Sequence, residues 1–230
     1  IIKDSGKKFK CAFSITGTAI EQFQQYVPEF IDSMKMLVDT GCVEFVSETY
    51  DHSLASLINE EEFKRQVERH DALIYNLFGQ KPKVFRNTEL IYNDEIAAQI
   101  ASMGFKAVLT EGAKHILGWK SPNYVYSSAG APKMKLLFRN SKLSDDIAMR
   151  FADYSWHEYP LTADKYMSWI SQSPKDEQLV NIAVNYETIG DNHPRETGIF
   201  DFFKALPRFA AEKGVEFWTP SEAVSKLKAV

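Results

Sequence analysis

The sequence predicts an α/β fold in which parallel strands are connected by crossover helices. Short apolar runs typical of strands alternate with longer segments of helical periodicity along the whole chain, as repeated βα units require. With 230 residues, 44% of them hydrophobic, the chain is long enough to bury one substantial core. No linker, repeat or break in composition divides it. We therefore expect a single domain over residues 1–230.

Seven short runs are predicted to be strands. They cover residues 9–15, 43–47, 83–87, 106–110, 134–139, 179–184 and 215–218. The stretch at 112–133 breaks the alternation and contains several aromatic residues. Because long loops after strands often shape ligand sites, this stretch is a candidate part of a binding site.

Helices are predicted between the strands, with signals at their ends. They cover roughly residues 18–38, 60–77, 93–103, 163–172, 197–212 and 221–228. The second has apolar residues at intervals of four and three, namely Phe63, Val67, His70, Ile74 and Leu77. Asn59, Thr162 and Ser221 are the expected N-caps. Gly79, Gly104 and Gly214 follow helices, where a left-handed residue commonly ends the helix.

Composition argues against several classes of partner. A net charge of −4 gives no basic footprint for nucleic acid. No apolar run reaches the roughly 18 residues that a membrane helix needs, so we expect no membrane partner. Cys11 and Cys42 form no disulfide framework, which favours a reducing, cytoplasmic location. The chain opens on Ile1 and not on methionine, which indicates a fragment lacking its natural N-terminus.

The sequence contains no motif for a metal or another cofactor. There is no His-x-x-x-His pair and no Cys-x-x-Cys. Gly41, Gly112 and Gly118 are isolated and form no phosphate-binding loop, and there is no Gly-x-Ser-x-Gly. We therefore expect no metal and no cofactor.

Acidic and amide side chains follow several predicted strands. In a closed parallel barrel, reactive groups gather at the C-terminal ends of the strands. The candidates at those ends are Glu48, Glu89, Glu111, Asn140 and Glu187. Cleavage of a glycosidic bond needs one carboxylate at the anomeric carbon and a second carboxyl group that protonates the leaving oxygen. Glu89 fits the first role, so the sequence indicates a sugar-cleaving site.

Four stretches carry a resemblance to a known family. They are Gly41–Leu54 (GCVEFVSETYDHSL), Val84–Tyr92 (VFRNTELIY), Leu143–Phe151 (LSDDIAMRF) and Asn185–His193 (NYETIGDNH). Over nearly its whole length the chain resembles the family 57 glycoside hydrolases, in particular their α-amylase branch. The resemblance implies an incomplete (β/α)7 TIM-like barrel that cleaves or transfers α-glucan chains with retention of configuration. It implies a glutamate nucleophile, which is Glu89 here, an aspartate acid/base, an α-glucan or maltooligosaccharide substrate, and no cofactor.

The acid/base position departs from the family pattern. Where the family motif resembles Asp-Tyr-Glu-Thr-Phe-Gly, this chain has Asn185-Tyr-Glu-Thr-Ile-Gly. Because an amide cannot supply a proton at neutral pH, catalysis should fall by on the order of 10²–10⁴-fold. The open explanations are a naturally weakened homologue, an engineered change, or a substitute acid such as Glu187 or Asp191. Glu187 is expected on the same strand face as Asn185, one pleat further along.

A second departure concerns the first strand of the barrel. Family members usually begin with a strand that carries His-Gln-Pro, and no His-Gln-Pro occurs here. Either that strand lies upstream of Ile1 or this homologue has lost it. A barrel without the strand has an exposed edge, which is an association hazard.

Further residues are candidates for binding the substrate. They are Glu44, Glu48, His52, Trp119, Asp146, Glu187 and His193. His52 and His193 can hydrogen-bond sugar hydroxyls. The aromatic side chains of Trp119, Tyr124, Trp156 and Tyr186 can stack on sugar rings, with ordinary packing as their alternative. Asp146 has an alternative role in the first turn of a helix, where its charge complements the dipole. Glu44, on the same strand face as Glu48, can instead be a paired core carboxylate.

Two alternatives to a working glycosidase remain open. One is a homologue that holds an α-glucan without cutting it, which an affinity for glucan without products would indicate. The other is a polysaccharide deacetylase, whose barrel is similar and which would need a bound divalent metal.

Overall fold

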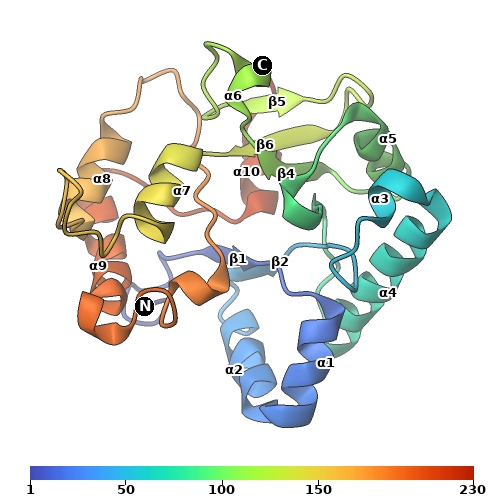
Figure 1. The fold of residues 1–230 in the computed structure, drawn as a ribbon, viewed down its shortest axis with the longest axis horizontal. Helices are drawn as coiled ribbons and strands as arrows, with labels where there is room; N and C mark the ends of the chain where they lie inside the picture. The colour runs from blue at the N-terminus through green and yellow to red at the C-terminus, as the bar shows by residue number, and fades with distance from the viewer. The chain divides into compact units, whose positions relative to one another are not determined.

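The contacts within the chain group its residues into two units. The structure is a computed structural model that describes residues 1–230 (Figure 1). Unit 1 comprises residues 1–9, 112–124 and 139–217. Unit 2 comprises residues 10–111, 125–138 and 218–230. The expectation of a single domain stays a prediction.

The strands form two sheets. They are β1 (Cys11–Phe13), β2 (Val43–Phe45), β3 (Val84–Arg86), β4 (Ala107–Glu111), β5 (Val125–Ser127) and β6 (Lys135–Arg139). β1 pairs with β2 in parallel, and the other sheet has the order β3-β4-β6-β5, with β3 and β4 parallel. A parallel bridge between Ser47 and Phe85 connects the end of β2 to β3. The α/β class predicted from the sequence is therefore confirmed.

The helices of unit 2 begin and end at residues with clear physical signals. They are α1 (Gly17–Tyr26), α2 (Pro28–Val38), α3 (Ala55–Ile58), α4 (Glu60–Phe78), α5 (Asp94–Ser102) and α10 (Pro220–Lys226), with the 3₁₀ turn η1 (Thr88–Leu90). The Asn59 side chain accepts from the Glu62 amide at 3.0 Å, and Gly79 ends α4 with φ of 69°. Both predicted ends of this helix are confirmed.

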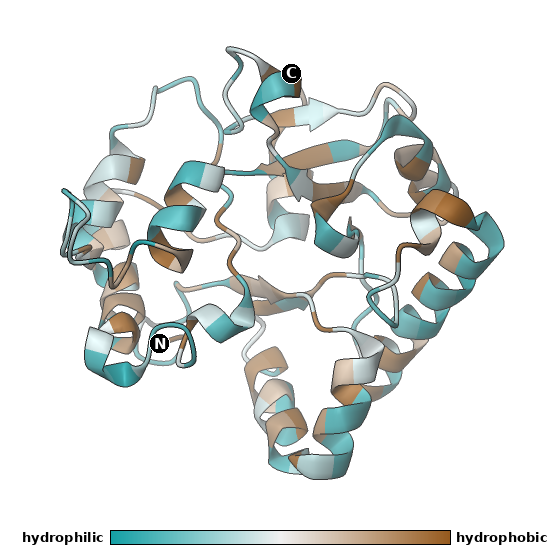
Figure 2. Ribbon diagram, in the orientation of Figure 1, coloured by the Kyte–Doolittle hydropathy of each residue, from teal (hydrophilic) through white to brown (hydrophobic).

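Buried side chains hold the helices of unit 2 onto its strands. One cluster includes Phe63, Phe85, Ile96, Ile100, Val108 and Leu136, and a second includes Ile20, Ile31, Met34, Phe45, Ile74 and Phe78. Figure 2 shows the hydrophobic colouring of β1 and β2 and the alternating colours along α4. The rings of Phe45 and Phe78 stack with centroids 4.4 Å apart. This packing fixes β2, and the loop that follows it, against α4.

Unit 1 is largely helical. It contains α6 (Lys114–Leu117), α7 (Ser141–Ala148), α8 (Ala163–Ser171), α9 (Ile199–Glu212) and the 3₁₀ turns η2 (Tyr186–Thr188) and η3 (Arg195–Thr197). Its core includes Ile147, Phe151, Leu161, Tyr166, Ile199, Phe202 and Leu206. The Tyr166 and Phe202 rings meet edge to face at 5.6 Å, which packs α8 on α9. No helix in either unit has the length and apolar character that crossing a bilayer requires.

Several predicted elements are wrong. The predicted strands at 179–184 and 215–218 are irregular, whereas β5, inside the aromatic stretch at 112–133, was not predicted. The helix expected over 18–38 is two helices, because Pro28 lacks an N–H and keeps Val27 (φ −144°) out of helical geometry. The N-cap of α10 is Thr219 and not Ser221. Thr162 does precede α8, but its side chain does not cap the helix backbone.

A close contact at the start of α1 leads to a first prediction. A Cβ on Gly17 would lie 2.3 Å from the Tyr50 ring. Glycine to alanine in a helix ordinarily gains roughly 0.5–1 kcal/mol. For Gly17→Ala we expect instead a loss of about 1–3 kcal/mol in the free energy of unfolding, because the site is overpacked, measured by urea denaturation. Adding Tyr50→Leu should relieve the loss, and a Gly17→Ala protein as stable as the unmodified chain would contradict the contact.

Candidate active site

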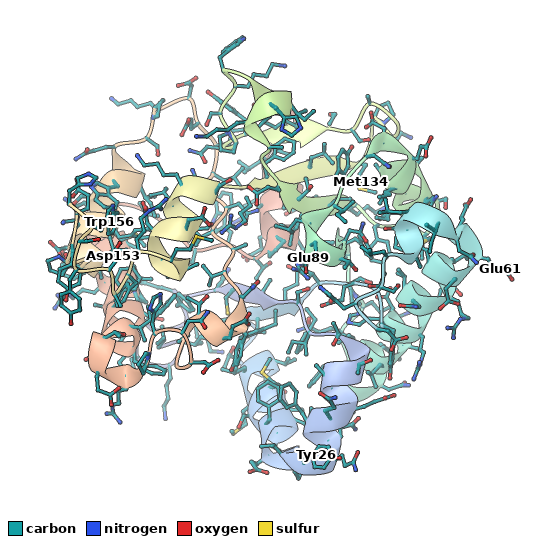
Figure 3. All side chains as sticks on the ribbon, in the orientation of Figure 1. Tyr26, Glu61, Glu89, Met134, Asp153 and Trp156 are labelled. Carbon is teal, nitrogen blue, oxygen red and sulfur yellow. The ribbon has the colours of Figure 1, made fainter.

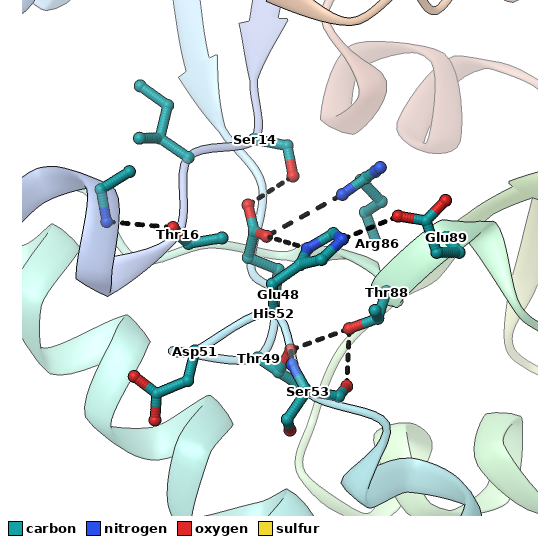
Figure 4. Close-up of polar contacts among 12 residues, drawn as sticks. Ser14, Thr16, Glu48, Thr49, Asp51, His52, Ser53, Arg86, Thr88 and Glu89 are labelled. Carbon is teal, nitrogen blue, oxygen red and sulfur yellow. Dashed lines mark hydrogen bonds and ion pairs between the residues drawn. The ribbon is translucent and has the colours of Figure 1, made fainter.

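The buried carboxylate of Glu48 is the centre of a polar cluster in unit 2 (Figure 4). Glu48 follows β2, and its side chain is 2% exposed. Ser14, just after β1, donates its hydroxyl to Glu48 Oε1 at 2.6 Å. Arg86, at the end of β3, places Nη1 3.9 Å from Glu48 Oε2, and His52 Nδ1 lies 3.8 Å from the same oxygen. The ends of three neighbouring strands therefore supply groups that surround one buried charge.

Glu89 is joined to this cluster through His52. His52 Nε2 lies 2.8 Å from Glu89 Oε1, while the Glu89 side chain is 71% exposed (Figure 3). The hydrogen bond from His52 holds the pKa of Glu89 below its usual range, outweighing the effect of burial, and the charges of His52 and Arg86 act in the same direction. Glu89 therefore stays an anion to lower pH than an ordinary glutamate. An accessible, ionised carboxylate is the group that a retaining glycosidase uses as its nucleophile.

The backbone at His52 and Glu89 is left-handed. His52 and Glu89 both have φ of 54°, and Leu90 has φ of 57°. Such conformations are uncommon for residues other than glycine and cluster at functional sites, where the surrounding structure must hold them. The two turns are held to one another, because Thr49 and Thr88 share a hydroxyl hydrogen bond of 2.9 Å and Thr88 donates to the Ser53 carbonyl at 2.7 Å.

The loop that carries His52 is also tied to α1 and α4. Thr18 donates its hydroxyl to Asp51 at 2.7 Å. The Arg69 guanidinium lies 3.5 Å from the centroid of the Tyr50 ring, and the Tyr50 hydroxyl donates to Glu21. Burial, reinforced by the bond to Glu21, raises the pKa of Tyr50 to about 12, so the hydroxyl remains a donor. These contacts fix the residues on either side of Asp51 and hence the position of the His52 turn.

Glu44 is bound elsewhere in unit 2. Its carboxylate accepts from the Ser221 amide at 2.9 Å and from the Ser221 hydroxyl, in the first turn of α10. Glu44 is half-buried, and its hydrogen bonds to Ser221 are those of a paired carboxylate. Its role in substrate binding stays a prediction.

Asn185 and Glu187 lie in unit 1 and are exposed, but they do not share a strand face. Asn185 immediately precedes the turn η2, and Glu187 lies within that turn. The expectation that Asn185 and Glu187 lie on one face of a strand is therefore wrong, because residues 179–184 form no β-ladder. Asn181 and Ala183 bond instead to Asn140, Ser144 and Arg139. That Glu89 and position 185 flank one glycosidic bond stays a prediction.

His193 is buried in unit 1. Its Nε2 lies 3.0 Å from the Ile147 carbonyl and 3.1 Å from that of Ala148, at the C-terminal end of α7, and its ring packs against Phe151. Nδ1 is buried without a partner. The ring therefore binds the last carbonyls of α7, and its contact with sugar stays a prediction.

Asp146 is buried in α7 and pairs with Arg150 at 2.7 Å. The expectation that it lies in the first turn of a helix is wrong. Asn140 is the N-cap of this helix, accepting from the Leu143 amide at 3.0 Å, so Asp146 falls in its second half. Burial raises the pKa of Asp146, and the charge of Arg150 opposes that rise.

The aromatic candidates differ in exposure. Trp119 is 93% exposed in unit 1, which suits a stacking surface, and Tyr186 is also exposed. Trp156 packs into the core of unit 1 against Trp169, and the Tyr124 hydroxyl donates to Asp176 at 2.5 Å. Trp156 therefore has a packing role, and Tyr124 has a hydrogen-bonding role.

The sequence reasoning missed Ser14 and Arg86 as members of the cluster. A local signal existed for both, since each is the last but one residue of a predicted strand (9–15 and 83–87), close to the strand ends that pointed to Glu48 and Glu89. No group of three or more His, Cys, Asp or Glu side chains in the structure is arranged to hold a metal ion.

Comparisons with known proteins place the chain among carbohydrate-active enzymes. Residues 2–230 match the family model for glycosyl hydrolase family 57. A Methanocaldococcus jannaschii protein named "Putative alpha-amylase" is 48% identical over 222 residues, which is 96% of this chain and 47% of that protein. The chain thus spans about half the length of this curated relative.

Solved structures share the fold at lower identity. The 4-alpha-glucanotransferase from Thermococcus litoralis superposes with a TM-score of 0.76 at 18% identity, covering 96% of this chain and 34% of that one. A "putative polysaccharide deacetylase" from Mycobacterium smegmatis superposes with a TM-score of 0.64 at 17% identity, covering 99% of this chain and 76% of that one. At these identities the likenesses establish the fold and not the activity.

The ion pair between Asp146 in α7 and Arg150, which follows that helix, gives a second prediction. We expect Arg150→Gln to lower the free energy of unfolding by about 3 kcal/mol at pH 7, because it leaves the buried Asp146 charge without its partner. The folded-state pKa of Asp146 is raised, so protonation favours the folded protein. The loss should therefore shrink as pH falls through that pKa, as measured by urea denaturation across pH 4–7. A loss independent of pH, or one that persists in Arg150→Gln/Asp146→Asn, would contradict this account.

Proposed function

Because the chain belongs to glycosyl hydrolase family 57, we propose that it forms the catalytic region of an α-glucan-active, α-amylase-like glycoside hydrolase that retains configuration. Glu89 is the proposed nucleophile, and position 185 is that of the acid/base, compromised here by asparagine. The incomplete (β/α)7 barrel is part of the same proposal. The names of the M. jannaschii and T. litoralis relatives, "Putative alpha-amylase" and 4-alpha-glucanotransferase, support α-glucan as the substrate.

The arrangement of Glu89 carries this proposal. A nucleophile must be ionised, accessible and held in place, and Glu89 combines a lowered pKa with an exposed side chain and a bond to His52. Attack forms a bond between a Glu89 oxygen and the anomeric carbon. The glycosidic bond breaks with its electron pair going to the leaving oxygen, which must then take up a proton. Water cleaves the resulting ester in the second step.

The second candidate function follows from Asn185. Its exposed amide has no proton to give at neutral pH, so a homologue that binds α-glucan without cleaving it is the alternative. A polysaccharide deacetylase is a third candidate, and elemental analysis for a divalent metal in the purified protein tests it.

Substrates with different leaving groups separate the roles of Glu89 and Asn185. An aryl α-maltoside with a nitrophenyl leaving group needs little protonation, so we expect the unmodified chain to cleave it and Glu89→Gln to lose that activity. On maltooligosaccharides, Asn185→Asp should raise turnover by on the order of 10²–10⁴-fold, because it restores a general acid. Release of nitrophenol and chromatography of the sugars are the measurements.

The control variant is Asn192→Asp, which makes the same chemical change at an exposed position of the same segment and should leave turnover on both substrates unchanged. Equal rates for Glu89→Gln and the unmodified chain would refute the nucleophile. Glucan affinity without products, even for Asn185→Asp, would select the binding homologue. A loss of activity in Glu187→Gln alone would identify Glu187 as a substitute acid.

A further inference from the structure

We propose that His52 is a positioning residue for Glu89, which holds Oε1 of the carboxylate and leaves Oε2 to attack the sugar. This inference rests on the proposed role of Glu89 as the nucleophile. It differs from the expectation that His52 binds sugar hydroxyls, and it identifies which oxygen of Glu89 reacts.

The bond between the two side chains has a defined direction. His52 Nε2 lies 2.8 Å from Glu89 Oε1, and an ionised carboxylate only accepts hydrogen bonds. Nε2 therefore carries the hydrogen, whether the ring is neutral or protonated. Oε2 has no hydrogen-bond partner within unit 2 and belongs to an exposed side chain, so it is the oxygen that a substrate can reach.

His52 itself is held on its other side. Nδ1 faces the buried carboxylate of Glu48, whose own position is fixed by the hydroxyl of Ser14 and the charge of Arg86. Asp51, the other charged residue on this loop, is bound to Thr18. Nε2 is thus bound to Glu89, while Nδ1 faces the carboxylate of Glu48 at 3.8 Å, which is an electrostatic contact longer than a hydrogen bond.

The hydrogen bond changes strength during the reaction. When Oε2 forms its bond to the anomeric carbon, Oε1 becomes the carbonyl oxygen of a neutral ester and accepts more weakly from His52. When water cleaves the ester, the carboxylate returns and the bond regains its strength. By stabilising the carboxylate, His52 therefore favours the departure of Glu89 from the sugar in the second step. In the first step, the same hydrogen bond fixes the orientation of the Glu89 side chain.

The test uses His52→Asn in the full chain. Asparagine tolerates the left-handed backbone at this position better than most residues, but its side chain is too short to replace the ring. Without the donor, the pKa of Glu89 should rise toward its ordinary value, as measured by ¹³C NMR titration of labelled glutamate carboxyls assigned with Glu89→Gln. On the nitrophenyl maltoside, kcat should fall by on the order of 10²-fold with little change in KM.

His157→Asn is the matched control, because His157 is an exposed histidine paired with Glu158 in unit 1, and it should change neither quantity. A rise in KM alone, with the pKa of Glu89 unmoved, would mean that His52 binds substrate and would overturn the proposal. Turnover by Glu89→Gln would refute the proposed nucleophile, whereas the titration measures the contact between His52 and Glu89 independently of activity.

A second variant keeps the proposal testable if His52→Asn does not fold. Glu48→Gln preserves the size of the buried side chain but removes the anion that faces His52 Nδ1. The ring should then lose its fixed orientation, lowering kcat on the nitrophenyl maltoside without raising KM. An unchanged kcat in a folded Glu48→Gln protein, checked by its thermal melt, would overturn the positioning role.

Discussion

The burial of the Glu48 charge is the constraint on which the candidate site depends. A carboxylate removed from water needs partners with hydrogens or positive charge, since an unpaired buried charge is very costly. Its partners come from three places: Ser14 after β1, Arg86 at the end of β3, and His52 in the loop that follows β2. The parallel pairing of β1 with β2, and the bridge from Ser47 to β3, bring these chain segments together. The orientation of His52, and through it that of Glu89, follows from satisfying this one group.

A second set of hydrogen bonds holds the strained backbone of the two turns. Left-handed conformations cost of order 1–3 kcal/mol each in residues other than glycine, and they persist only where neighbouring contacts compensate. The Gln66 side chain accepts from the Asp51 amide and the Ser53 hydroxyl, which ties the His52 turn to α4. The side-chain amide of Asn87 donates to the Ser56 hydroxyl and to the Ile91 carbonyl. These two bonds close the turn that carries Glu89. Polar side chains of the loops and of α4 thus hold the site in a shape that the local sequence does not favour.

Features with local causes were predictable from the sequence, and features with distant causes were not. The cap at Asn59, the left-handed Gly79 and the strand ends at Glu48 and Glu89 each depend on a few neighbouring residues. The apolar run at 179–184 was predicted as a strand, but Ser144 and the Arg139 side chain bind its Ala183 backbone in place of a ladder. Such partners are distant in sequence, as are Ser14 and Arg86, two of the partners of Glu48. The motif at Asn185–His193 indicated Asn185 as a site residue. The turn η2, which begins directly after Asn185, was not predicted.

The way in which unit 2 is assembled from separate stretches of the chain affects how it is synthesised. Its β1 and β2 lie near the start of the sequence, yet α10 supplies Ser221 to Glu44 and Glu222 to Lys10 from the last stretch of the chain. Because translation proceeds from the N-terminus, these two contacts cannot form until residues 218–230 have left the ribosome exit tunnel. A nascent chain stalled before residue 218 would therefore present Glu44 and Lys10 without these partners, although β1 and β2 have both been synthesised.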